Sequence, residues 1–384
     1  MAKNELTEAK KAKNDEFYTQ YADIEKEISA YLEFDPDVFR GKTVFLPCDD
    51  PEWSNFTKYF AQNFERFGLK KLISTSYAVE SKKYKSGYQP TLFETSDPQF
   101  DKIKTVKNGK IFTLSHDKTG DRRINVNDLE WHYLEGDGDF RSDEIKKLRD
   151  ESDIIITNPP FSLFREFLAW IVKAEKKLLI IGNMNAITYK EVFPFIQDNK
   201  LWLGATNFNT GMYFQVPKDF VYANTYKFER EQNGVKVNRV PGVCWFTNIE
   251  HGRRHQSLPL MTMADNIKFS KHKEIKGKKY PRYDNYNAIE VPFADAIPND
   301  YNGVMGVPIS FLDKYSPEQF EILGLSRYTK TQGMSKEFVD AYYKSGQTGQ
   351  ISEGHPDLCY YDNNNRPVVP YMRVLIKLIK RTNI

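Results

Sequence analysis

A group of four residues directly follows the most apolar strand pattern of this 384-residue chain. The pattern runs from Asp153 to Thr157, and the four residues are Asn158, Pro159, Pro160 and Phe161. Two consecutive prolines fix φ and remove two backbone N–H donors, so the turn is stiff and rich in carbonyl acceptors that a helix does not use. The Asn158 side-chain oxygen and the Pro159 carbonyl can each accept one N–H of an exocyclic amino group, while Phe161 lies on the flat ring that carries it. Because this arrangement draws the nitrogen lone pair toward an electrophile, the turn predicts group transfer to that nitrogen.

The turn also stands where open parallel sheets bind their ligands, outside the carboxyl ends of the strands. A neutral Asn158 is adequate for transfer of a methyl group, because an amine that has gained a methyl loses a proton readily. The alternative is a proline-bounded loop in which Phe161 only fills the core. The apolar strand directly ahead of the turn favours the chemical interpretation.

The electrophile needs a pocket of its own, and a methyl sulfonium cofactor has a charged amino-acid end, a ribose and an adenine. The residues that follow the first expected strand and open the next helix are Pro47, Cys48, Asp49, Asp50, Ser54 and Asn55. Acids at this turn can bind the ammonium or sulfonium group, and the helix N-terminus can hold the carboxylate. The alternative is that Asp49 and Asp50 only cap the helix.

A second acidic turn, Asp137 to Phe140, follows the strand that begins at Trp131. Asp139 can accept a hydrogen bond from the adenine amino group of the cofactor while Phe140 packs on the adenine ring. A flexible surface turn is the alternative. Neither acidic turn has the His and carboxylate spacing of a metal site, so no metal ligand is predicted.

The composition excludes several classes of protein. A hydrophobic content of 40% and an aromatic content of 14% supply the core of one large domain or two smaller ones, so the chain is neither disordered nor fibrous. The first fifteen residues are polar and no stretch is long and apolar enough for a bilayer, so neither a signal peptide nor a membrane span is expected. Cys48, Cys244 and Cys359 lack CxxC spacing, which indicates a reducing, cytoplasmic compartment.

Short apolar runs alternate with helical periodicity through the first 200 residues. Strands are expected over 43–46, 72–76, 131–134, 153–157 and 178–182, and helices over 23–33, 53–67 and 163–174. This order predicts an α/β, Rossmann-like fold with a mainly parallel sheet flanked by helices. Beyond residue 200, the pieces GMYFQV and GVCWFTN suit an antiparallel hairpin at the edge of the sheet.

A boundary is expected near residue 250, with a catalytic domain over 1–250 and a smaller mixed region over 251–384. The stretch 253–282 has a net charge of +7, whereas the whole chain carries +3. Clustered Lys and Arg with interleaved Tyr suit phosphate neutralisation, and the arginines can also read guanine edges. The alternative is a solvated basic loop. The predicted DNA-binding residues are Arg253, Arg254, Lys271, Lys273, Lys276, Lys278, Lys279 and Arg282.

Together these motifs resemble a known enzyme family. The turn from Asn158 to Phe161 resembles the catalytic motif of amino-methyltransferases that use S-adenosylmethionine, in the Asn form typical of adenine-N6 enzymes. Residues 13–20 (KNDEFYTQ) resemble an N-terminal cofactor motif of one subgroup. With the segments 47–56, 244–248 and 306–312, the likeness is to the EcoRI-type adenine-specific DNA methyltransferases, and it spans about residues 13 to 325.

The resemblance implies a Rossmann-like methyltransferase domain over 1–250 and target recognition by 251–384. It implies methyl transfer from S-adenosylmethionine to the N6 amino group of a flipped-out adenine in a specific double-stranded DNA sequence. A bacterial or phage-encoded monomer in a restriction-modification system is expected, with a cognate restriction endonuclease as a further partner. The implied cofactor-binding residues are Phe17, Tyr18, Thr19, Cys48, Asp49, Asp50, Ser54, Asn55, Asp139, Phe140 and Asn158.

A flipped-out adenine needs protein side chains that pack around it, because removing the base from the stack costs a few kcal/mol. Tyr213, Trp245 and Phe246 are predicted to line this base pocket, with core packing as the alternative. Two other functions stay open. The same chemistry can act on an RNA adenine or a protein glutamine, or the chain can be a DNA-binding relative without turnover. The basic stretch favours nucleic acid, and the intact turn after Thr157 favours an enzyme.

Overall fold

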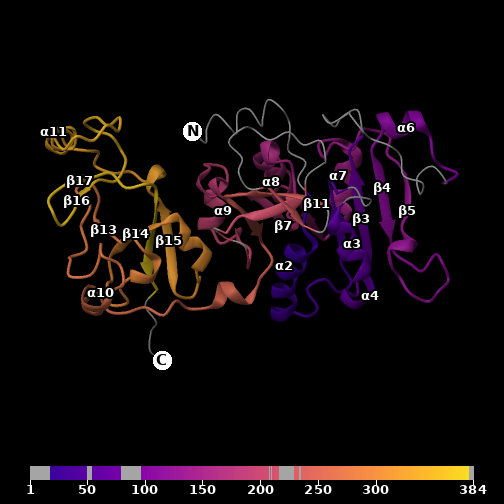
Figure 1. Ribbon diagram of the computed structural model, residues 1–384, viewed down its shortest axis with the longest axis horizontal. Helices are drawn as coiled ribbons and strands as arrows, with labels where there is room; N and C mark the ends of the chain where they lie inside the picture. Colours follow the sequence, from indigo (N-terminus) through magenta and orange to yellow (C-terminus); the bar gives the residue numbers. More distant parts are fainter. Residues whose placement is uncertain are drawn as a thin grey trace. The chain divides into compact units, whose positions relative to one another are not determined.

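A computed structural model describes residues 18–49, 54–78, 97–206, 208, 210–215, 229–232 and 235–379. The described residues form two compact units (Figure 1). The described residues within Met1–Ala186 and Leu201–His251 form unit 1, and those within Ile187–Lys200 and Gly252–Ile384 form unit 2. Unit 2 therefore takes one short segment, 187–200, from inside the region that the sequence assigns to the catalytic domain.

The main sheet of unit 1 has eight strands among the described residues, in the order β5-β4-β3-β2-β6-β7-β12-β8. The four central strands β3, β2, β6 and β7 are parallel, and the strands on either side of them are antiparallel. Continuous apolar runs such as TVFL and IIIT form the central strands because both faces of the sheet are covered. The strands are β5 (Glu130–Tyr133), β4 (Lys110–Leu114), β3 (Lys71–Ser76), β2 (Thr43–Leu46), β6 (Ile154–Thr157), β7 (Lys177–Asn183), β12 (Val243–Thr247) and β8 (Trp202–Leu203).

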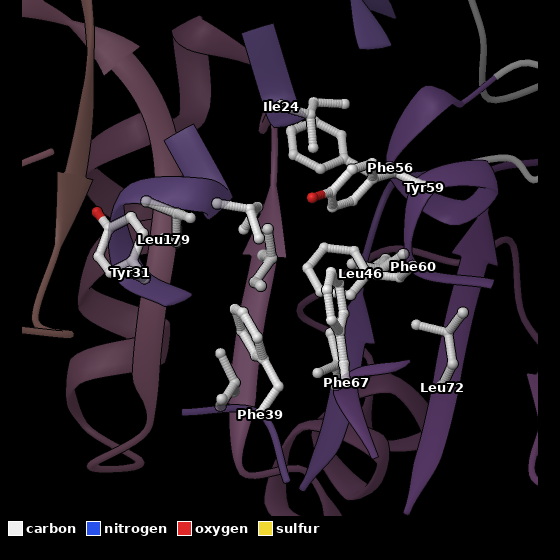
Figure 2. Close-up of a cluster of buried hydrophobic side chains, with 14 of the residues drawn as sticks. Ile24, Tyr31, Phe39, Leu46, Phe56, Tyr59, Phe60, Phe67, Leu72 and Leu179 are labelled. Atoms are coloured by element: carbon white, nitrogen blue, oxygen red, sulfur yellow. The ribbon is translucent and has the colours of Figure 1, made fainter. Parts of the chain in front are cut away.

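Helices cover both faces of this sheet. One face packs against α2 (Tyr21–Phe34), α3 (Asn55–Gln62) and α4 (Phe64–Phe67) through a buried core rich in aromatic rings, part of which is shown in Figure 2. The other face carries α7 (Asp143–Glu151) and α8 (Phe164–Val172), and α6 (Lys102–Lys107) precedes β4. The predicted α/β architecture is confirmed, although the single helix expected over 53–67 is broken at Asn63 into α3 and α4.

A second, smaller sheet of unit 1 has the order β1-β9-β11-β10 and is antiparallel throughout. Its strands are β1 (Tyr18–Thr19), β9 (Met212–Gln215), β11 (Val235–Val240) and β10 (Glu229–Gln232). The expectation that GMYFQV and GVCWFTN form antiparallel strands is confirmed, and the two pieces lie in different sheets: β9 pairs within this sheet, whereas β12 pairs with β7 and β8 of the main sheet. Edge-strand patterns of this kind do not specify a partner.

Unit 2 contains a four-stranded sheet, β13-β14-β18-β15, in which only the β13–β14 pair is parallel. A buried ion pair crosses it, because Arg373 donates to both carboxylate oxygens of Glu290 at 2.7–3.1 Å. The elements of this unit are α9 (Phe193–Gln197), α10 (Met263–Phe269), β13 (Ala288–Glu290), β14 (Val304–Pro308), β15 (Phe320–Leu325), α11 (Lys336–Lys344), β16 (Tyr360–Tyr361), β17 (Pro367–Val368) and β18 (Arg373–Leu378). Within the described ranges, no helix has both the length and the apolar content to cross a bilayer.

Candidate active site

The chain order reverses at β2, which lies between β3 on one side and β6 on the other. In open parallel sheets the carboxyl ends of two such strands diverge and leave a crevice for a ligand. The turn that begins with Pro47 and Cys48 follows β2, and Asn158 follows β6. The sequence therefore brings two of its predicted motifs to one end of one sheet.

Asp49 is 6% exposed, and two hydroxyl groups lie within hydrogen-bond distance of its carboxylate. Ser54 Oγ donates to Oδ1 at 2.7 Å, and Thr157 Oγ1 lies 2.5 Å from Oδ2. Ser54 is also the N-cap of α3, since its Oγ accepts the Phe56 N–H at 3.1 Å. Asp49 thus supports a helix cap, in line with the alternative considered for it, and joins the turn after β2 to the end of β6.

Cys48 and Tyr77 meet beside this turn. Cys48 has a left-handed backbone, with φ at +68°, and a half-buried side chain. Burial, the Cys48 thiol and the Asp139 carboxylate raise the pKa of the Tyr77 hydroxyl. Tyr77 follows β3 and so belongs to the same edge of the sheet, but sequence reasoning missed it. Its position directly after an expected strand was the available signal.

The N-terminal motif reaches the same edge through β1. The Asn55 amide of α3 donates to the Thr19 carbonyl oxygen at 2.8 Å. Thr19 is 3% exposed, and its hydroxyl has no hydrogen-bond partner within the described part of the chain. Tyr18 contributes the backbone pairing of β1 with β9. Phe17 and Asp50 lie outside the described residues.

The acidic turn after β5 is docked onto the end of β3. The Ala78 N–H donates to the Asp137 carbonyl at 2.8 Å, and a Cβ on Gly138 would collide with the Ser76 carbonyl oxygen. Gly138 also has φ at +87°, so both space and backbone require glycine there. The interpretation as a free surface turn does not hold, because neighbouring backbone fixes this loop.

Asp139 and Phe140 differ in their contacts and in their burial. The Asp139 carboxylate pairs with the Arg141 guanidinium at 2.5–2.8 Å, and this hydrogen bonding lowers the pKa of Asp139. Phe140 is 1% exposed and packs edge-on against Phe167 and Trp170 at 5.1 and 5.6 Å. The prediction that Phe140 packs on a cofactor ring is therefore corrected, because the ring is buried beneath α8.

The turn from Asn158 to Phe161 connects the end of β6 to the segment that leads into α8. Asn158 is half-buried, and Pro159 is buried. The Pro160 carbonyl accepts the Leu163 N–H at 2.9 Å in a short 3-10 helix, which corrects the expectation that a helix does not use these carbonyls. Phe161 meets Phe214 of β9 with ring centroids 6.3 Å apart.

Comparison with known proteins decides the family. A family model described as adenine-specific methyltransferase EcoRI matches residues 5–379. The chain belongs to this family of adenine-specific methyltransferases. Type II methyltransferase M.EcoRI of Escherichia coli is 43% identical over 339 residues, which cover 88% of this chain and 94% of the relative.

Two mycoplasma proteins show the same likeness. Type II methyltransferase M.MgeORF184P of Mycoplasma genitalium is 36% identical, over 82% of this chain and 84% of that protein. Type II methyltransferase M.MpnI of Mycoplasma pneumoniae is 33% identical, over 82% and 83%. No solved structure matches the chain. Family membership makes the chain a site-specific adenine DNA methyltransferase, with a methyl donor as its cofactor.

Two of the predicted base-pocket residues of this methyltransferase lie in its core. Trp245 is fully buried, and its ring meets Phe56 of α3 with centroids 6.0 Å apart. Phe246 is fully buried on the opposite face of β12, against Phe164 of α8 at 5.0 Å. Both predictions are wrong because the strand that carries these residues is covered on both sides. Tyr213, on β9, is half-buried.

The basic stretch of the methyltransferase lies in unit 2, and its two first arginines are held by other residues. Arg253 pairs with Asp313 at 2.5 Å. Arg254 is 6% exposed, and its guanidinium donates to Asn199 at 2.7 Å, so its assignment to DNA contact is corrected. Lys278 is half-buried, and the other predicted DNA contacts are exposed: Lys271, Lys273, Lys276, Lys279 and Arg282. Of these, Lys271 forms an ion pair with Asp295.

Proposed function

We propose that this enzyme transfers the methyl group of S-adenosylmethionine to the N6 amino group of a flipped-out adenine in a specific double-stranded DNA sequence. The observation that carries the proposal is the convergence of the turn after β2, the β1 segment and the turn at Asn158 on one edge of the main sheet. Direct contacts link these three segments, through Asn55 to Thr19 and through Asp49 to Thr157. A single surface loop would not bring a pocket for the methyl donor next to the turn from Asn158 to Phe161, which we call the amine clasp.

The residues around Thr19 fit the polar end of such a cofactor. The buried Thr19 hydroxyl lacks a partner within the described residues, and leaving a buried donor unpaired costs about 1–3 kcal/mol. A carboxylate or hydroxyl of the cofactor would satisfy it. Residues proposed to hold S-adenosylmethionine are Tyr18, Thr19, Cys48, Asp49, Ser54, Asn55, Asp139 and Asn158, with Phe17 and Asp50 outside the described ranges. When bound, the cofactor supplies an electrophilic methyl group on sulfonium.

The chain's own residues then hold the target amine. The Asn158 side-chain oxygen and the Pro159 carbonyl accept the two N–H groups of the adenine amine, and Phe161 stacks on the purine. Pro159 and Pro160 keep the turn stiff, so these acceptors are in place before the base arrives. The role of Asn158 is to orient the nitrogen lone pair toward the methyl carbon. The C–S bond would break as the N–C bond forms, with its electron pair staying on sulfur, and the extra proton of the methylated amine would then pass to solvent water.

The exposed lysines of unit 2 are proposed to neutralise DNA phosphates. Lys273, Lys276 and Lys279 are exposed and sit in a stretch whose net charge is +7. Each phosphate contact releases condensed counterions, so the affinity for DNA should fall as salt rises. Arg282 is the exposed arginine of this set and the candidate for a guanine edge. We also propose that the enzyme acts as a monomer in the cytoplasm and protects the sites of a cognate restriction endonuclease.

One incubation tests the reaction and the substrate together. The purified enzyme receives methyl-labelled S-adenosylmethionine with genomic DNA, with total RNA, or with a glutamine-containing protein mixture. The proposal expects label in DNA alone, and sequencing should place it on adenine N6 within one recurring sequence. Label confined to RNA or protein would overturn the DNA assignment, and label on cytosine would overturn the role given to Asn158.

A further inference from the structure

The backbone pairing between β2 and β6 ends at Ile155, three residues before Asn158. Val44 pairs with Ile154 and Phe45 with Ile155, and the parallel register is not continued beyond them. A side chain makes the next link. The Thr157 hydroxyl lies 2.5 Å from the Pro47 carbonyl oxygen and 2.5 Å from Asp49 Oδ2. Beyond the backbone pairs, the side chain of Thr157 joins the end of β6 to the turn after β2.

The hydrogen bonding of Thr157 is shielded from water, and both acceptors lie in the same turn. Thr157 is fully buried and Asp49 nearly so, and hydrogen bonds are stronger where water is excluded. A hydroxyl has one proton, yet both of its acceptors belong to the turn after β2, so either choice ties the same two segments together. The turn is itself anchored elsewhere, because Ser74 Oγ of β3 donates to the Asp49 carbonyl and Ser54 Oγ to the Asp49 carboxylate.

We propose that Thr157 is a positioning residue that holds the amine clasp at a fixed distance from the methyl donor. This rests on the proposed function. Thr157 directly precedes Asn158, and adjacent Cα atoms are only about 3.8 Å apart, so a shift of Thr157 moves Asn158 with it. The hydroxyl is directed to the Pro47 carbonyl and the Asp49 carboxylate, which are groups of the protein itself. Its effect falls on the alignment of amine and methyl group, and therefore on the transfer step rather than on binding.

Two variants separate the hydroxyl from the volume of the side chain. Thr157→Val keeps the shape and removes the donor, whereas Thr157→Ser keeps the donor. We expect Thr157→Val to lower the single-turnover rate by about 10- to 100-fold, since a misplacement of 1 Å can cost that much. The dissociation constants of S-adenosylmethionine and DNA should change less than about threefold. Thr157→Ser should recover most of the rate.

A matched control exists on β3, which lies on the other side of β2 from β6. Thr75 of β3 is as buried as Thr157, but its hydroxyl has no hydrogen-bond partner in the described part of the chain. Thr75→Val is thus the same change without a link to break, and its rate should stay near that of the wild type. A double-mutant cycle adds a second measure: Thr157→Val combined with Asp49→Ala should be less impaired than the product of the two single effects.

Several results would overturn the inference. One is a Thr157→Val enzyme that transfers methyl at the wild-type rate, and another is an equal loss in the Ser and Val variants, which would indicate packing. A third is a rise in the dissociation constant of S-adenosylmethionine with no change in single-turnover rate. Failure of the proposed function would look different, because the wild-type enzyme itself would then leave DNA unlabelled.

Discussion

The ring of Phe161 meets the ring of Phe214 nearly at right angles, with centroids 6.3 Å apart and an interplanar angle of 78°. Phe214 is fully buried in β9, directly opposite Thr19 of β1. The N-terminal strand and the ring that follows the prolines are thus packed against one shared residue. Phe161 therefore contacts the small sheet through Phe214.

Replacing Phe161 tests its proposed stacking on the target base. We expect Phe161→Ala to weaken stacking by about 1–3 kcal/mol, the usual value for a base on an aromatic side chain. A fluorescent adenine analogue at the target position reports this as a smaller change in emission on binding. Phe34→Ala, at an exposed aromatic residue of α2, is the control. An unchanged signal in Phe161→Ala would count against a stacking role.

The lysines near the end of the basic stretch should set the salt dependence of DNA binding. Replacing Lys276, Lys278 and Lys279 with Gln should reduce the slope of log affinity against log salt, by about 0.9 for each phosphate that is no longer neutralised. The control removes three exposed lysines of unit 1, and its slope should stay at the wild-type value; these are Lys102, Lys104 and Lys107. Equal slopes in the two triple variants would remove the first set from the interface.

Arg254 should matter for folding rather than for DNA. Its guanidinium is buried, bonded to Asn199 and 6.0 Å from the centre of the Tyr315 ring. We expect Arg254→Ala to lower the free energy of unfolding by about 1–3 kcal/mol, because buried partners lose a hydrogen bond. Arg282→Ala, at an exposed position, should instead weaken DNA binding and leave stability unchanged. Urea unfolding and DNA titration on both variants check this, and the reverse pattern would contradict it.

Glu27 of α2 should make stability depend on pH. The carboxylate is fully buried and accepts from Tyr31, Ala205 and Thr206, but burial outweighs these bonds and raises its pKa. The folded state therefore holds the proton more tightly than the unfolded chain. Its contribution to stability is complete below the ordinary Glu pKa and is lost as pH rises through the raised value.

The Glu27→Gln variant isolates this effect, because an amide does not titrate and retains an acceptor for Tyr31 and Ala205. As pH rises from about 5 to 9, the wild type should lose stability relative to the variant. Urea unfolding of both proteins across this range measures the difference. Parallel curves would show that Glu27 does not change its protonation on folding.

Much of the main sheet could be predicted from the sequence, since β2, β6 and β7 are continuous apolar runs that only a doubly covered sheet accommodates. The strand β4 was missed, although it lies beside β3. The two-residue strand β1 is too short for any periodicity, and its pairing with β9 depends on residues nearly 200 positions away.

The site was predicted better where the chemistry is local than where burial decides. The residues from Asn158 to Phe161 follow their strand as expected, because a proline pair cannot continue it. Trp245 and Arg254 were misassigned for a shared reason. The same aromatic pattern is found in strands at the edge of a sheet and in strands of the core. The charge of Arg254 does not indicate that its partner is Asn199, which lies 55 positions earlier in the chain.

Methyl transfer by the proposed mechanism depends on Asn158 as the acceptor that orients the target amine. Its most direct test is the single-turnover rate of methyl transfer to DNA by Asn158→Ala, measured with the dissociation constants of S-adenosylmethionine and DNA. We predict that methyl transfer is abolished while both binding free energies stay within about 1 kcal/mol of the wild type, because many other residues share the binding of each ligand and the main contribution of Asn158 falls on the transition state. Turnover near the wild-type rate would contradict the account.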